Sequence, residues 1–288
     1  MVIHWPTVPN VLGVDTGVDR VRCGRMVSWL LRLGFLVFYT DAQALPEDEP
    51  TPETTPAVFS QKPFVEIGAS YEHLTNGYTP WASQYLDVTV PMRERELLNM
   101  NILNANRFSQ NDTAAYVSYA YPLAYGVLSA EGGYTVNPQF LTKDLYGLGW
   151  NGRLPYQLNY LLTARESHYQ VGKTQRFNFG LDKYFWDYRV AYTLVRSVLD
   201  YTERSWLSKF QAQWLSEAGH RFGLTYSTGH EPMVVTIGNL VNIDVQTYQI
   251  DGLYKINETV GVTVAAWHAV QGSYYQRNGG QVGVRVAF

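Results

Sequence analysis

Arg176-Phe-Asn-Phe-Gly-Leu-Asp182 is the stretch that decides the fold, because its side chains alternate between polar or small and apolar at every step. A β-strand turns successive side chains to opposite faces, so this strand has one charged face and one face of large apolar groups. In a soluble β-sandwich the apolar face is buried in the core. In a transmembrane barrel it meets lipid, while the polar face lines a wet lumen. One strand alone does not separate the two.

The series of similar segments favours the barrel. Many of them run for about ten residues, the length that a tilted strand needs to cross a bilayer, whereas soluble strands usually have about five or six. The segments are 64–73, 83–90, 96–108, 113–122, 126–136, 143–153, 157–169, 174–184, 188–200, 206–215, 220–229, 244–256, 259–274 and 279–288. The pattern is irregular in 96–108, and Leu161 and Val195 are expected to point inward against it. We predict an all-β fold, a single antiparallel, transmembrane up-and-down β-barrel over residues 60–288, with about 14 strands and 12 as the alternative.

Composition supports the membrane alternative. Aromatic residues make up 15% of the chain, with 22 Tyr and 8 Trp, and charged residues only 16%. Tyr and Trp settle at membrane–water interfaces, where one end of the ring is apolar and the other wet. The mean hydropathy is nevertheless −0.20, and no apolar run approaches the ~20 residues of a membrane helix. Alternating strands explain both observations.

The N-terminal part predicts export. Residues 26–44 read as a signal peptide, with an apolar stretch before Ala42-Gln-Ala44, an A-x-A cleavage site. Residues 1–25 then look like a mis-called start, and 45–59 like a disordered spacer rich in proline and acid. The alternative is the N-terminal helix of a soluble protein. The only cysteine, Cys23, precedes the cleavage site, so the mature chain excludes disulfides and thiolate chemistry, and no cofactor is expected.

The balance of charge and the last segment of the chain indicate which classes of molecule the protein binds. Residues 57–288 carry 18 basic and 18 acidic side chains, so no basic field is available for nucleic acid. The last segment alternates cleanly and ends on Phe288, which is similar to the signal read by the barrel-assembly machinery. Expected partners are therefore this machinery and outer-membrane lipids, with glycan or small solutes as candidate cargo. The predicted location is the outer membrane of a Gram-negative bacterium.

The connections are expected to alternate between short periplasmic turns and longer outer loops. The short ones are 153–156, 185–187 and 257–259. The longer ones are Thr75–Ala82, Asn137–Thr142 and Glu231–Ile243.

Two motifs resemble the YaiO family of outer-membrane β-barrels. They are Tyr71-Glu-His-Leu-Thr-Asn-Gly-Tyr-Thr-Pro-Trp81, followed by Gln84-Tyr-Leu86, and Gly180-Leu-Asp-Lys-Tyr-Phe-Trp-Asp-Tyr-Arg-Val-Ala-Tyr-Thr193. Gly229-His-Glu231 and Phe288 add to the resemblance, which runs from about residue 62 to the end. It implies an outer-membrane barrel and little about activity. Passage of glycan or solute follows only by analogy with related barrels of polysaccharide-export systems.

The sequence gives only weak evidence for a catalytic or ligand-binding site. Glu166-Ser-His168 are adjacent, and neighbours on a strand face opposite sides, so they cannot form a nucleophile–base pair. Ser70 and Glu72 share the lumen face of their strand, whereas His73 is expected on the lipid face, so the three side chains do not form one site. Gly229-His-Glu231 offers two ligand types without a third, which is not a zinc site. Asn76, Gly77 and Trp81 read either as a ligand-binding loop or as a turn with an interface anchor. We expect no catalytic, metal or cofactor site and no enzymatic activity.

The charged residues expected to line the lumen are Glu66, Glu72, Asp87, Glu131, Arg165, Arg176, Asp182, Arg189, Lys209 and Arg285. They have two readings: salt bridges that fill a narrow barrel, or charges along a solute path. The sequence therefore leaves three functions open. These are a channel or accessory for solute or polysaccharide passage, a structural or surface-interaction barrel with a plugged lumen, and a lipid-modifying barrel enzyme.

Overall fold

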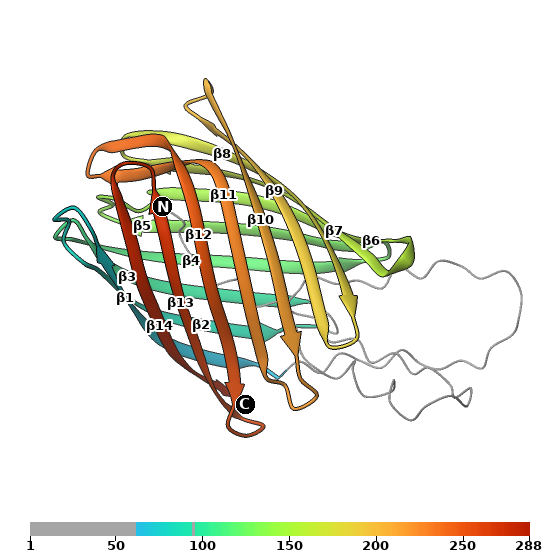
Figure 1. The fold of residues 1–288 in the computed structure, drawn as a ribbon. Helices are drawn as coiled ribbons and strands as arrows, with labels where there is room; N and C mark the ends of the chain where they lie inside the picture. Colours follow the sequence, from blue (N-terminus) through green and yellow to red (C-terminus); the bar gives the residue numbers. More distant parts are fainter. Residues whose placement is uncertain (1–61, 94–95) are drawn as a thin grey trace, which may run out of the picture.

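A computed structural model describes residues 62–93 and 96–288, which form one closed antiparallel β-barrel of fourteen strands (Figure 1). The strands are β1 (Phe64–Leu74), β2 (Trp81–Pro91), β3 (Leu97–Arg107), β4 (Gln110–Leu123), β5 (Gly126–Val136), β6 (Asp144–Leu154), β7 (Leu158–Tyr169), β8 (Gly172–Phe185), β9 (Tyr188–Leu199), β10 (Glu203–Leu215), β11 (Arg221–Thr236), β12 (Asn239–Lys255), β13 (Val260–Gln271) and β14 (Tyr275–Ala287). The predicted fold is confirmed, and the alternative of twelve strands is wrong. The expectations for the start, signal peptide and spacer lie outside the described residues.

Every strand pairs with its neighbours in the chain, and β1 pairs with β14 to close the ring. Phe64 lies opposite Ala287, and Leu74 lies opposite Arg277. Both ends of the described barrel therefore lie on one side, here called the terminal end. The opposite side, where β1 ends and β14 begins, is called the loop end.

Side chains alternate between the two surfaces of the wall. The strands have 11 to 17 residues, enough to cross a bilayer at a tilt. Ile67, Phe179 and Leu224 are exposed on the outer surface, while Glu66, Asp182 and Gln213 are buried on the inner one. A wall that is apolar outside and polar inside suits lipid around a wet lumen. In the described part of the chain, no helix is long and apolar enough to cross a membrane.

One expectation about local structure is wrong. The segment predicted as a long loop, Glu231–Ile243, is strand: β11 continues to Thr236, and β12 starts at Asn239 after a two-residue turn. Most connections at the loop end have only two or three residues, and only 75–80 and 137–143 are longer. The segment 96–108, predicted as a strand in spite of its irregular pattern, contains β3, whose side chains alternate from Leu97 to Arg107 with no break in its pairing to β2 or β4.

The facing of β8 gives a direct test of register. Phe179 is 42% exposed on the outer surface, whereas the neighbouring Asn178 donates a hydrogen bond of 2.7 Å to Thr163 inside the wall. We expect Phe179→Arg to lower the free energy of unfolding in lipid vesicles by roughly 2–4 kcal/mol, because the charge enters hydrocarbon. Asn178→Arg adds the same group to the polar lumen and serves as the matched control. Equal cost for both variants in urea titrations would contradict this register.

Candidate functional site: a polar lumen closed at the loop end

The ten charged residues predicted to line the lumen all lie on the inward-facing positions of their strands, and most of them form ion pairs with one another. Glu66 and Arg285 lie opposite each other across the β1–β14 seam, with a guanidinium nitrogen 2.7 Å from the carboxylate. Tyr85 and Thr263 also donate to Glu66, at 2.7 and 2.9 Å. A buried carboxylate with several donors is well satisfied. This group therefore joins four strands across the closure of the barrel.

A second pair lies on β5 and β7. Arg165 donates to both carboxylate oxygens of Glu131, at 2.6 and 2.5 Å. This two-point arrangement is the strongest geometry that a guanidinium and a carboxylate can adopt. Gly147 of β6 lies between the two strands, and a side chain there would collide with the Glu131 carboxylate. The glycine thus makes room for an ion pair that bridges across β6.

A third group lies on β7 to β10. Arg189 contacts Asp182 at 3.3 Å and donates to Gln213 at 3.1 Å, and Asn159 donates to Asp182 at 3.2 Å. Two residues of the predicted set lack such a partner. Within the described residues, neither Lys209 nor Asp87 has an oppositely charged group within 4.0 Å. One Asp87 carboxylate oxygen also lacks any hydrogen-bond donor. Asp87 is buried in the wall, whereas Lys209 is partly exposed and has no charged partner among the residues that the structure describes.

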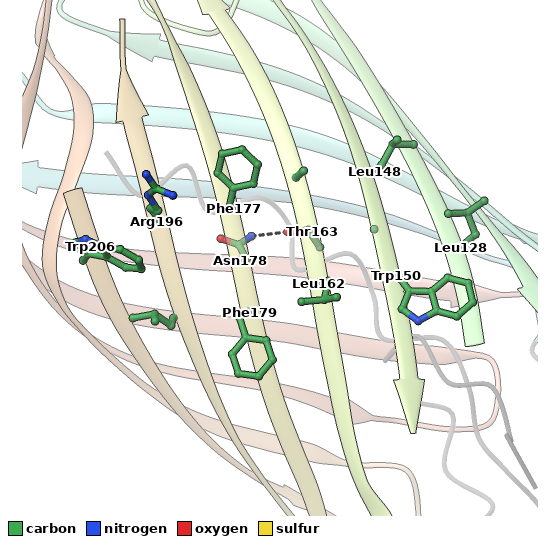
Figure 2. Close-up of a pocket in the computed structure, with 13 residues that line it drawn as sticks. Leu128, Leu148, Trp150, Leu162, Thr163, Phe177, Asn178, Phe179, Arg196 and Trp206 are labelled. Carbon is green, nitrogen blue, oxygen red and sulfur yellow. Dashed lines mark hydrogen bonds between the residues drawn. The ribbon is translucent and has the colours of Figure 1, made fainter. Parts of the chain in front are cut away.

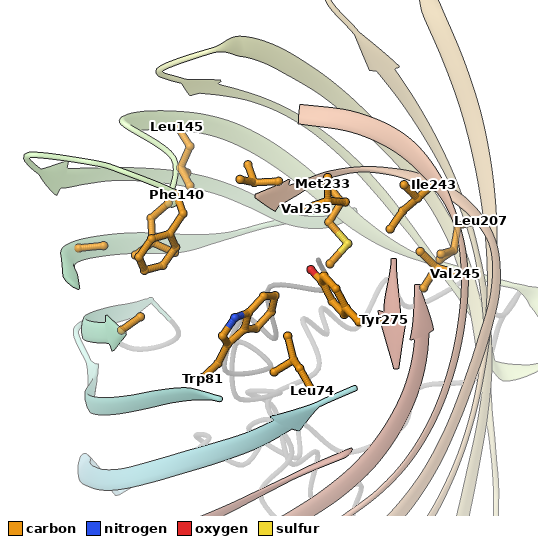
Figure 3. Close-up of a cluster of buried hydrophobic side chains, with 14 of the residues drawn as sticks. Leu74, Trp81, Phe140, Leu145, Leu207, Met233, Val235, Ile243, Val245 and Tyr275 are labelled. Atoms are coloured by element: carbon orange, nitrogen blue, oxygen red, sulfur yellow. The ribbon is translucent and has the colours of Figure 1, made fainter. Parts of the chain in front are cut away.

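Apolar side chains close the lumen at the loop end. One cluster of buried residues, here called the plug, gathers side chains from most of the wall (Figure 3). Its members are Leu74, Trp81, Ala105, Ala114, Tyr116, Phe140, Leu141, Leu145, Val195, Leu207, Met233, Val234, Val235, Ile243, Val245 and Tyr275. They include β4 and β11, which are seven positions apart in the ring of fourteen strands and so lie on opposite walls. The plug therefore spans the lumen.

The plug depends on a hairpin that leaves the wall. β10 pairs with β11 only as far as Gly229, and β12 pairs with β13 only from Val245 onward. Between these points residues 230–244, here called the inward hairpin, form strand pairs only with each other, and the Asp244 carbonyl at the base accepts a hydrogen bond from the Gly272 N–H. Met233, Val234 and Val235 are all buried, so both faces of the hairpin are covered. Figure 3 shows Met233 and Val235 directed across the mouth toward Trp81 and Tyr275.

Gly229 sits where the hairpin departs. Its φ is +140°, and a side chain there would collide with the backbone of Trp206 and Leu207 on β10. A residue without Cβ is needed where two backbones approach this closely. The glycine thus lets β11 turn away from β10 into the lumen.

Two polar contacts hold the inward hairpin in place. The Arg176 guanidinium of β8 reaches past β9 and β10 to Glu231, at 2.8 Å, and the Glu231 side chain is almost fully buried. Asn242 donates to Glu203 at the start of β10, at 3.0 Å. A charged pair under an apolar cover fixes one geometry, because an unpaired carboxylate there would be costly. Both strands of the hairpin, β11 and β12, are therefore bound to the wall near its base.

Arginines and aromatic rings support the plug from below. Arg107 lies 4.5 Å from the centre of the Trp81 ring, and Arg277 lies 5.1 Å from it. Arg277 also pairs with Glu72 at 2.9 Å. Such cation–ring contacts are strongest when water is excluded. The prediction of Trp81 as an interface anchor is therefore wrong: the ring is only 1% exposed, in the middle of the plug.

The 137–143 connection reaches the plug through one carboxylate. Asp112 at the start of β4 accepts hydrogen bonds from the backbone N–H groups of Gln139, Phe140 and Leu141, at 2.7 to 3.0 Å. This turns the connection inward and buries Phe140 and Leu141. Asp112 was not among the residues predicted from the sequence. In the sequence it is an acidic residue at the start of a strand, and nothing there indicates that it binds the 137–143 connection.

The motifs weighed for chemistry lie as follows. Glu166 and His168 face outward and are hydrogen-bonded at 2.8 Å, whereas Ser167 is buried inside. No nucleophile therefore joins them. His230 faces outward and pairs with Asp244 at 2.7 Å, while Glu231 faces the lumen. Among the described residues, no group of three His, Cys, Asp or Glu side chains is arranged to hold a metal ion.

Comparison with known proteins places the fold. No protein-family model matches the chain, and no curated protein matches it, so the YaiO resemblance stays a prediction. Among solved structures, the CymD monoaromatic hydrocarbon channel is similar with a TM-score of 0.55 at 9% identity, over 79% of this chain and 89% of that one. The Acinetobacter baumannii outer membrane protein Omp33 has a TM-score of 0.49 at 12% identity, over 79% and 99%. The chain has the porin-like fold of outer-membrane β-barrels.

Proposed function

We propose that this protein is an outer-membrane channel for small polar solutes or glycan segments, and that the conformation described here is its closed state. The observation that carries the proposal is the contrast between lumen and mouth. The lumen is lined by charged and amide groups, whereas the mouth is shut by apolar side chains, several of them on a hairpin that forms no strand pairing with the wall. Apolar constrictions stop ions by excluding water. A hairpin that forms no strand pairing with the wall, and is held by a few contacts at its base, is a part that can move.

The class of solute is proposed from the resemblance to other barrels and from the side chains of the lumen. The two YaiO-like motifs support a role in glycan or solute passage, as does the polar surface of β7 to β10, where Asn178, Gln211 and Gln213 line the inner face. Such amides suit hydrogen bonding to neutral sugars. We also propose export through the signal peptide and insertion by the barrel-assembly machinery, with Phe288 as the signal. Recovery of the protein from the soluble periplasmic fraction would count against this location.

A second function is favoured by the plug itself. A cluster that spans the mouth and buries Trp81, Met233 and Val235 is also what a permanently closed, structural barrel would have. We do not propose an enzyme, because the outward Glu166 and His168 lack a nucleophile beside them. Single-channel recording in planar bilayers separates the first two functions. A channel shows voltage-driven or spontaneous openings of the wild-type protein, whereas a structural barrel stays silent while folded.

Lys209 tests whether a solute meets the lumen charges. Because this lysine has no carboxylate within 4.0 Å in the described part of the barrel, Lys209→Glu breaks no ion pair. We expect it to shift the reversal potential toward cations. Unit charges 4 Å apart interact by about 1 kcal/mol in water, roughly a fivefold change in permeability ratio. Lys173→Glu, on the outer surface above Tyr201, is the matched control and leaves selectivity unchanged. Equal shifts in both variants would argue against a path beside Lys209.

Arg165→Glu provides the contrast. It places a second carboxylate against Glu131, whose partner it removes. We expect mainly lost stability, because like charges replace a bidentate pair. We therefore propose two roles for the lumen charges: the paired groups fill and stiffen the barrel, and Lys209 lies along the path of a solute.

A further inference from the structure

Arg196 faces the membrane rather than the lumen. Arg196 lies on β9 between Val195 and Ser197, which are both buried on the inner side. Its cross-strand neighbours are Phe177 on β8 and Trp206 on β10. Both rings are exposed on the outer surface. Arg196 therefore belongs to the lipid-facing surface, three residues before β9 ends at the loop end.

This guanidinium has no anionic partner in the described residues. No carboxylate lies within 4.0 Å of it, and its buried Nε–H has no hydrogen-bond acceptor. It lies beside the Trp206 ring, 5.7 Å from the ring centre. An arginine on the lipid face costs little near the interface and more toward the midplane. A phosphate would remove that cost, because guanidinium and phosphate form paired charge-assisted hydrogen bonds.

An apolar groove lies directly beside Arg196. It has a volume of about 570 Å³ and crosses the outer face of β5 to β10 (Figure 2). Ala164 forms a low point between Leu148 and Phe177, its two cross-strand neighbours. Figure 2 shows Phe177, Phe179 and Leu162 along it, with Arg196 beside Trp206 at one end. The groove has the shape and polarity that an acyl chain needs.

A polar cluster lies on the loop-end side of the same groove. Glu166 is two residues beyond Ala164 on β7 and accepts a hydrogen bond of 2.7 Å from Gln175 of β8. His168 contacts Glu166 at 2.8 Å and Asp144 at 2.5 Å. All four face outward. Carboxylates, an amide and an imidazole together suit the hydroxyl groups of a sugar.

We propose that this outer face binds one phosphorylated glycolipid of the outer leaflet. An acyl chain lies in the groove over Ala164, a phosphate pairs with Arg196 beside Trp206, and the sugar meets the cluster around Glu166. Ala164, Phe177 and Arg196 lie in one cross-strand row, and Glu166 lies two residues nearer the loop end. The phosphate therefore lies beside the acyl chain, and the sugar lies beyond both. Barrels of this class keep both chain ends on the periplasmic side, which places the loop end in the outer leaflet. The site does not depend on whether the lumen conducts.

The test measures lipid binding to the delipidated full-length barrel by native mass spectrometry. The probes are lipid A, its unphosphorylated analogue, and phosphatidylglycerol. We expect lipid A to bind wild-type protein, and Arg196→Gln to weaken it about tenfold or more, as expected for a lost charged hydrogen bond. Arg196→Lys keeps the charge and retains most of the affinity. Arg204→Gln, an exposed arginine on β10 outside the groove, is the matched control and binds like wild type.

Several outcomes overturn the proposal. Undiminished lipid A binding by Arg196→Gln would remove the phosphate site, and so would equal binding of the unphosphorylated analogue. Equal, Arg196-dependent binding of phosphatidylglycerol would assign the site to a phospholipid instead. If Arg204→Gln lost as much affinity for lipid A as Arg196→Gln, the loss would reflect the overall surface charge and not a phosphate site at Arg196. Heat-modifiable gel mobility confirms that each variant is folded before binding is measured.

Discussion

Replacing residues 230–244 with the two-residue turn Asn-Gly is expected to turn the closed barrel into an open pore. Gly229 and Val245 lie opposite each other on β11 and β12, so a two-residue turn can join them without disturbing the wall. The change removes Met233 and Val235 from the plug, and it removes Glu231 from Arg176. Water can then enter the mouth, and ions follow it.

We expect single-channel conductance about an order of magnitude above that of the wild-type protein, because an apolar constriction that excludes water is lost. Ile237→Ala is the matched control. Ile237 lies at the tip of the same hairpin, 45% exposed and outside the plug, so this variant stays closed. A shortened barrel that is folded by heat-modifiable gel mobility yet does not conduct would sink the channel proposal and favour the structural barrel.

The fold was predictable because its signal is local. Most strands of the wall have lipid on one side and a polar lumen on the other, so period-two alternation is visible within a single strand, as in the seven residues 176–182. The signal fails where both sides are apolar. Met233-Val-Val235 has no alternation because both of its faces are buried in the plug. With Pro232 before it, this stretch resembles a loop in sequence and is a strand in the structure.

The candidate site was less predictable, because its contacts are distant in sequence. The alternation of side chains along each strand predicts that Glu66 and Arg285 point inward. Their ion pair could not be predicted, because it forms only when β1 pairs with β14. The same holds for Arg176 and Glu231, which meet only because the hairpin leaves the wall. Trp81 was misassigned because tryptophan in a membrane protein is usually an interface residue. Here it closes the lumen instead.

The most deeply buried ion pair carries the largest expected effect on stability. The side chains of Arg277 and Glu72 are 3% and 9% exposed, and their charged atoms are 2.9 Å apart beneath Trp81. Arg277→Leu leaves the Glu72 carboxylate buried, with the Trp267 N–H at 3.3 Å as a remaining donor. We therefore expect the free energy of unfolding to fall by about 3–5 kcal/mol, the usual cost of an unpaired buried charge. Urea titration in lipid vesicles measures it.

The double variant Glu72→Leu/Arg277→Leu separates a lost pair from lost packing. Replacing both charges with apolar groups of similar size is often neutral, so we expect most of the stability to return. Lys62→Leu is the control: Lys62 pairs with Glu258 at 3.9 Å on an exposed surface, where removal changes stability by at most about 1 kcal/mol. If the double variant instead cost as much as the two single variants together, the two charges would act independently. The plug would then be supported by the arginine's contact with Trp81 rather than by its ion pair.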